Sequence, residues 1–262
     1  MEKNYLLPAV VSMLSYLRHV DGPISVMCPE HEFDELRVEL LGLVGNISIG
    51  YFKPDNAHPN ELYHSVIANR EARFAAVERA KENEITLLID ADTIFSPRVV
   101  EVLEILAANP NSERLWGVVE YSRASDAYLY FKAKDRAGVF RDTDPESKER
   151  CYEGVFGKKW RDCLAAPQPN NGFIAFRNAR ALAAQWRTFY RQGLLHAEVN
   201  PEDDQVPLAA AIVAIGFTFH RLEEAFNSKG EVNGPYAVFH AYAGLWRNEF
   251  RAALAPIATV SS

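Results

Sequence analysis

The sequence Ile85-Thr86-Leu87-Leu88-Ile89-Asp90-Ala91-Asp92 decides how this chain is interpreted. Residues 85–89 form a nearly continuous apolar run, which is typical of a strand buried on both faces of a parallel sheet. In an extended segment, residues i and i+2 face the same side, so we expect Asp90 and Asp92 to converge while Ala91 points away. Paired carboxylate oxygens suit Mg²⁺ or Mn²⁺. The alternative is a solvated turn with no ligand.

The segments around this strand alternate between helical and extended patterns. Apolar spacing predicts helices over 6–20, 30–44, 60–82 and 97–108, and strands over 24–28, 47–52 and 115–121. Such alternation predicts an α/β fold with a mostly parallel central sheet flanked by helices. Its ligand crevice is expected at the carboxyl ends of the strands.

The second half of the chain is less regular at first and then periodic again. Residues 122–169 are mixed in charge and aromatic content, and we interpret them as an irregular lobe or insertion. Beyond them, the pattern predicts strands over 172–176, 217–222 and 238–240, and helices over 178–192 and 203–215. We expect a single domain over 1–262, with a nucleotide-binding half over about 1–121 and an acceptor and donor-sugar half over about 122–262.

Composition excludes several classes of protein. The chain has 262 residues, of which 48% are hydrophobic and 24% charged, as in one large globular domain rather than a disordered chain. With 28 Lys and Arg against 35 Asp and Glu, the net charge of -7 argues against a nucleic-acid partner. No transmembrane segment is expected, although a peripheral membrane contact is compatible with the sequence, and we expect a cytoplasmic location.

Several short motifs follow one another in a recognisable order. They are Asn4-Tyr5 before a helix, Arg73, Leu88–Asp92, Asn170–Phe173, Asp203–Gln205, Leu222–Asn227 and His240–Arg247. Together they span nearly the whole chain. In this order the sequence resembles the glycosyltransferases of the GT-A fold. It is most similar to the retaining family 8 group, which includes glycogenin and bacterial lipopolysaccharide galactosyl- and glucosyltransferases.

The resemblance implies a metal site. Asp90 and Asp92 match the family's metal-binding acidic motif, with Asp90 also placed to reach the ribose, and His240 matches the third protein ligand. An imidazole beside two carboxylates favours Mn²⁺ over Mg²⁺. The alternative for His240, taken alone, is a structural histidine.

The resemblance also implies contacts to the donor nucleotide. Tyr5, Arg73, Asp90, Gly244 and Arg247 match positions that bind the nucleotide sugar. Arg247 stands where the family has a lysine that holds the diphosphate. A guanidinium keeps that charge and can grip phosphate oxygens with two hydrogen bonds.

Three residues are implied as catalytic: Asn171, Asp204 and Gln205. Asn171 precedes Gly172 as in the family's Asn-Ser-Gly turn, although the serine is missing, and would contact a donor or acceptor sugar. Asp204 and Gln205 match an Asp-Gln pair beneath the donor sugar. The Gln205 amide would lie near the anomeric carbon and stabilise oxocarbenium character there.

One departure from the family concerns the start of the chain. Family members open with a strand ahead of Asn-Tyr that forms part of the base pocket, whereas only Met1–Lys3 precede Asn4. The alternatives are a start upstream of Met1, a truncated chain, or a base site built differently. The nucleotide and the role of Tyr5 depend on which of these holds.

The predicted function is transfer of a hexose from a nucleotide diphosphate sugar, a UDP-sugar, to a hydroxyl of a carbohydrate or glycoconjugate acceptor. The predicted reaction depends on Mn²⁺ or Mg²⁺ and retains the anomeric configuration. One alternative is an inverting, family 2-like transferase with Asp203 or Asp204 as its base. Another is a catalytically silent nucleotide- or carbohydrate-binding module on the same scaffold.

Overall fold

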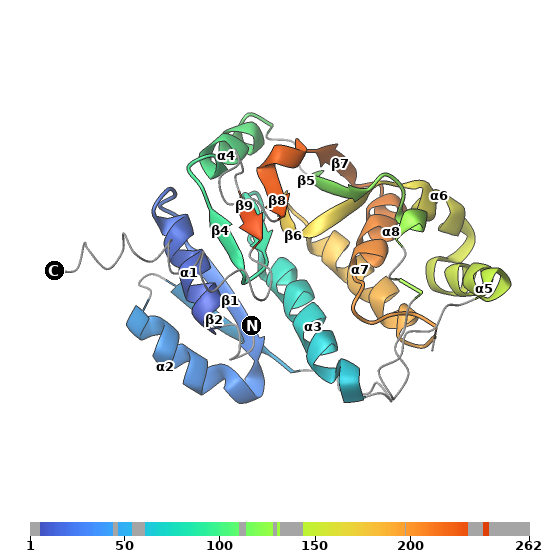
Figure 1. Ribbon diagram of the computed structural model, residues 1–262, viewed down its shortest axis with the longest axis horizontal. Helices are drawn as coiled ribbons and strands as arrows, with labels where there is room; N and C mark the ends of the chain where they lie inside the picture. The colour runs from blue at the N-terminus through green and yellow to red at the C-terminus, as the bar shows by residue number, and fades with distance from the viewer. Residues whose placement is uncertain are drawn as a thin grey trace.

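The computed structural model describes residues 6–43, 47–53, 61–109, 114–127, 130–131, 144–196, 198–229 and 238–240. These residues form an α/β fold in which helices flank three groups of strands (Figure 1). At the N-terminal end, β1 (Ile24–Pro29) pairs in parallel with β2 (Ile47–Phe52). The apolar side chains on one face of this pair pack against α1 (Leu6–Leu17) and Leu40 of α2 (Phe33–Leu43).

The central sheet has four strands in the order β3-β6-β5-β7. They are β3 (Thr86–Ile89), β5 (Arg114–Tyr121), β6 (Gln168–Phe176) and β7 (Thr218–Arg221). β6 is antiparallel to both β3 and β5, and only β5 and β7 pair in parallel. The expectation of a mostly parallel sheet is therefore wrong for this part of the chain.

The route of the chain between β5 and β6 explains the mixed sheet. The segment expected to be irregular contains the helices α5 (Pro145–Phe156) and α6 (Trp160–Ala165). After them β6 returns beside β5 in the opposite direction. An antiparallel neighbour needs no crossover over the face of the sheet, so this segment is free to form a helical lobe of its own (Figure 1).

Two hydrophobic cores cover the two faces of the central sheet. Along β6, Phe173 and Ala175 pack on one face with α4 (Val99–Ala107), whereas Ile174 and Phe176 pack on the other. That second core includes α3 (His64–Arg79), α7 (Arg180–Gly193) and α8 (Gln205–Ile215). The alternation of buried side chains thus follows the period of two of a strand.

β3 differs from its prediction in burial. All four of its residues are half-buried rather than buried on both faces. Among the described residues it pairs only with β6, and the residues at its carboxyl end border a pocket instead of a second strand. An apolar run therefore predicted the strand correctly, but could not predict how many neighbours the strand has.

A third, small sheet lies after the acidic turn. It consists of β4 (Thr93–Phe95), β9 (Val238–His240) and β8 (Asn227–Lys229), in that order. β4 and β9 are antiparallel, and Thr93 is the register partner of His240. The pairing places the backbone of His240 beside Thr93, the residue that follows Asp92. In the described part of the chain, no helix is long and apolar enough to cross a bilayer.

Phe74 tests the packing between α3 and α7. Its ring is fully buried and meets Trp186 edge-on, with 4.9 Å between the ring centroids. We expect Phe74→Ala to lower the free energy of unfolding by about 3–5 kcal/mol, because it leaves a cavity in the larger core. Urea unfolding measures this. Val38→Ala, at a site 75% exposed, is the control and should change it by less than about 0.5 kcal/mol.

Candidate active site

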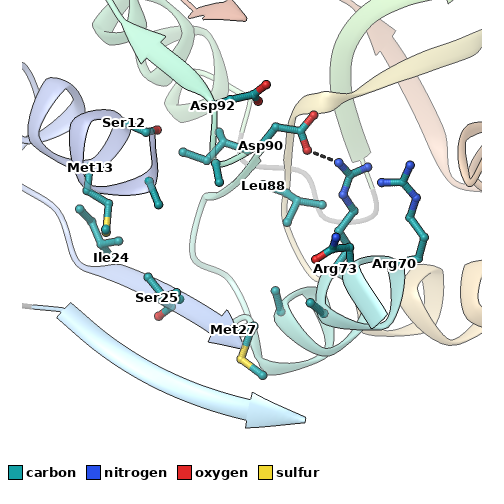
Figure 2. A pocket seen from close by; sticks show the side chains of 17 residues that line it. Ser12, Met13, Ile24, Ser25, Met27, Arg70, Arg73, Leu88, Asp90 and Asp92 are labelled. Atoms are coloured by element: carbon teal, nitrogen blue, oxygen red, sulfur yellow. Dashed lines mark hydrogen bonds and ion pairs between the residues drawn. The ribbon is translucent and has the colours of Figure 1, made fainter. Parts of the chain in front are cut away.

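A pocket of about 330 Å³ lies between α1, β1, α3 and the carboxyl end of β3. Figure 2 shows side chains of β1, such as Ile24 and Met27, on one side of it and Leu88 and Asp90 on the other. Its volume is in the range of small-molecule sites. The lining from α1 and β1 is mostly apolar, apart from Ser12 and Ser25, and it becomes charged where Arg70, Arg73 and the acidic turn meet.

The acidic motif forms a turn rather than an extended segment. β3 ends at Ile89, and the Asp90 backbone N–H still donates to the carbonyl of Gly172 in β6, at 2.9 Å. The Thr93 hydroxyl then closes the turn by donating to the Asp90 carbonyl at 2.8 Å. Ala91 packs against the α1 cluster and lines the pocket together with the two carboxylates. Both carboxylates lie at the same end of the pocket (Figure 2).

Asp92 carries a perturbed carboxyl group. Burial raises its pKa to about 6, and the negative charge of Asp90 adds to the increase. The ionised form of Asp92 therefore lacks sufficient compensating positive charge. A hard divalent cation at this turn would supply that charge, and two carboxylates are donors that Mg²⁺ and Mn²⁺ accept. The donor set thus fits such an ion.

Arg73 connects the acidic turn to the start of α8. One end of its guanidinium bonds to Asp90, and its Nη1 lies 3.3 Å from Oδ2 of Asp204. Burial alone lowers the pKa of Arg73, but the two carboxylates outweigh this and the net shift is upward. Arg70, one turn earlier on α3, also pairs with Asp204, with 3.3 Å between Nε and Oδ1. One buried carboxylate is therefore held by two arginines.

A chain of side-chain amides starts at the same carboxylate. Nδ2 of Asn171 donates to Oδ1 of Asp204 at 2.7 Å. Nε2 of Gln205 donates to Oδ1 of Asn171 at 3.2 Å. Gln168 completes the chain by donating from Nε2 to Oε1 of Gln205 at 2.6 Å. The network joins α3, β6 and α8, and Trp186 of α7 fixes its centre by donating to the Asp204 carbonyl at 2.7 Å.

Asp203 contacts the backbone of α8, whereas the neighbouring Asp204 pairs with arginines. Its Oδ1 accepts the backbone N–H groups of Gln205 and Val206, at 2.9 and 3.2 Å, and so satisfies free donors at the start of α8. Burial raises the pKa of this carboxyl to about 6. Asp203 therefore orients the helix that carries Gln205.

The structure brings most of the predicted site residues together. Arg73, Asp90, Asn171, Asp204 and Gln205 form one connected network, with Asp92 beside it. The other predicted site residues are not placed. The side chain of His240 and all of Tyr5, Gly244 and Arg247 lie outside the described residues.

The metal prediction stays untested. Where side chains are described, no three His, Cys, Asp or Glu groups gather closely enough to hold a metal ion. That statement does not cover His240, the predicted third ligand, because only the backbone of His240 is described. Its pairing with Thr93 places that backbone next to the acidic turn.

Two residues of the network were missed by the sequence analysis. Arg70 had a usable signal, because it lies three positions before Arg73 and so on the same face of the helix. Gln168 had none. Its partner Gln205 is 37 residues away, and only the pairing of β6 beside α8 brings the two amides together.

Comparison with known proteins supports the fold. The sequence matches no known protein-family profile and no curated protein. Among solved structures, the apo form of mouse xyloside xylosyltransferase 1 is similar, with a TM-score of 0.52 and 10% identity. The match covers 92% of this chain and 93% of that chain. The chain therefore shares the fold of a glycosyltransferase over nearly its whole length.

Asp203 predicts a pH dependence of stability. Its pKa is raised in the folded chain from 3.8 to about 6, so the folded state binds this proton more tightly than the unfolded state does. The contribution of Asp203 to stability is therefore greatest below about pH 4 and is lost as the pH rises through about 6.

Asp203→Asn keeps the accepting oxygen and removes this proton equilibrium. We expect its melting temperature to exceed that of the wild type at pH 8 by roughly 2–4 °C, for about 1 kcal/mol. The difference should shrink at pH 4.5. Thermal melts followed by circular dichroism measure both values, and a difference that does not change with pH would contradict the assignment.

Proposed function

We propose that this protein is a metal-dependent glycosyltransferase of the GT-A type. It moves a hexose from a UDP-sugar to a hydroxyl of a carbohydrate or glycoconjugate acceptor, with retention. The observation that carries the proposal is the network in which Arg73 joins the Asp90 carboxylate to Asp204, beside a ligand-sized pocket. The fold shared with a xyloside xylosyltransferase supports it.

Asp90 and Asp92, with His240 from the paired strand β9, are the residues that would hold Mn²⁺ or Mg²⁺. When bound, such an ion neutralises the diphosphate that leaves with the nucleotide. Arg73 lies next to the same turn and adds a fixed positive charge there. Tyr5, Gly244 and Arg247 are proposed to complete the grip on the nucleotide and its diphosphate.

The amide network would bind the donor sugar. Gln205 is half-buried, and Asn171 and Gln168 hold its amide. A fixed amide dipole beside the anomeric carbon stabilises developing positive charge without reorganisation during the reaction. Asn171 is fully buried against Asp204, and its role is to orient Gln205 and the floor of the sugar site.

The contacts of Asp203 and Asp204 favour retention over the inverting alternative. An inverting enzyme needs a carboxylate free to take a proton from the acceptor hydroxyl. Asp204 is 1% exposed and is held by two arginines and an amide. Asp203 is committed to two backbone N–H groups. Neither carboxylate is placed as a general base.

Binding of the donor nucleotide is the first test. We expect UDP, among UDP, GDP, CDP and ADP, to raise the melting temperature only when Mn²⁺ is present. At a concentration one hundred times its dissociation constant, a ligand adds about 2.7 kcal/mol, or roughly 5–10 °C for a chain of this size. No shift with any nucleotide would contradict a working donor site.

Turnover separates an enzyme from a silent binding module. Release of UDP from UDP-glucose, UDP-galactose and UDP-xylose, with and without sugar acceptors, is measured by a coupled assay. We expect Asp92→Asn to lower Mn²⁺-dependent turnover at least a hundredfold, because it removes a charged ligand. Asp34→Asn, on the exposed face of α2, is the matched control. Nucleotide binding without turnover would favour the silent module.

A further inference from the structure

We propose that Gln168 is a positioning residue that sets the orientation of the Gln205 amide. The inference rests on the proposed function, because that function places Gln205 beside the donor sugar. Gln168 is the first residue of β6 and is 1% exposed. Its Nε2 donates to Oε1 of Gln205 at 2.6 Å, which is the shortest hydrogen bond in the amide chain.

The direction of every hydrogen bond in this chain follows from one charge. Asp204 lies between two arginines, so it is ionised and can only accept. Asn171 must therefore turn its Nδ2 toward Asp204, which leaves its Oδ1 facing Gln205. Gln205 in turn must offer Nε2 to Asn171. Its Oε1 then points to residue 168, and a donor is required there.

Gln168 supplies that donor. If its amide were reversed, two carbonyl oxygens would face each other across 2.6 Å, so the partner also fixes the orientation of Gln168. The Gln168 Oε1 has no hydrogen-bond partner among the described residues. The bond to Gln205 is thus the contact that orders the Gln168 amide. Each amide, from Asn171 through Gln205 to Gln168, is oriented by the group before it.

The chain leaves Gln205 with one N–H and one oxygen lone pair, since an amide has two donors and two acceptor sites. Both are directed by the bonds already made. Without Gln168, the Gln205 amide could rotate, and its dipole would no longer be fixed relative to a donor sugar. Gln168 therefore acts on the reaction through Gln205 and not by touching the substrate.

Gln168→Glu is the decisive variant, because it keeps the shape and replaces the amide donor with a carboxyl group, which donates only when it is protonated. An ionised carboxylate cannot donate to Gln205, so we expect kcat to fall about tenfold or more with little change in KM for the donor sugar. Protonation restores the O–H donor. The activity of this variant relative to the wild type should therefore recover as the pH is lowered.

Two further variants make the result specific. Gln168→Leu has no donor at any pH, so its loss of kcat should not recover at low pH. Gln192→Glu makes the same chemical change on the exposed end of α7 and should leave kcat and its pH profile unchanged. The inference is overturned if Gln168→Leu turns over like the wild type, or if Gln168→Glu shows no recovery at low pH.

A measurement without turnover separates this inference from the proposed function. Side-chain amide NMR of the ¹⁵N-labelled protein reports the Gln205 and Asn171 NH₂ groups directly. In Gln168→Glu at high pH, the Gln205 resonances should shift and exchange faster, whereas Asn171 stays bonded to Asp204. If the wild type shows no transferase activity, the proposed function fails, and these spectra still decide the inference. Unchanged Gln205 resonances overturn it.

Discussion

The buried carboxylate of Asp204 is the constraint on which the site depends. Removing an ion from water is costly, and a buried carboxylate persists only when charged partners and hydrogen bonds compensate it. Here Arg70 and Arg73 supply the charge and Asn171 supplies the hydrogen bond. These partners come from α3 and β6, so satisfying one charge aligns two elements with the start of α8. The need to compensate the charge of the Asp204 carboxylate therefore sets the geometry of the site.

The same charge links two regions with different chemistry. On one side, Arg73 also bonds to Asp90 in the turn at the end of β3. Negative charge is in excess at this turn, and the pKa of Asp92 rises to about 6. On the other side, Asp204 accepts from the Asn171 amide, and Asn171 in turn accepts from the Gln205 amide. Arg73 and Asp204 therefore connect the carboxylate turn to the amide network.

Local sequence patterns predicted the helices and strands better than they predicted which of these elements lie side by side. The strand over 47–52 has the predicted bounds, and the helix of α8 begins two residues after its predicted start. The parallel sheet was wrong because strand direction depends on the path of the chain between β5 and β6. Burial of β3 was overestimated because an apolar run does not reveal how many strands lie beside it. The region 122–169 lacked periodicity, yet α5 and α6 pack there around stacked aromatic rings.

The sequence by itself determined that Asp90 and Asp92 follow a strand, and that Arg70 and Arg73 share a helical face. These are consequences of periods of two and about 3.6 residues, which act over short distances. Only the tertiary structure decided that Arg73 reaches both Asp90 and Asp204, and that Gln168 donates to Gln205. Such contacts join residues 17 to 131 positions apart. They exist because buried polar groups must find partners once the strands and helices have packed.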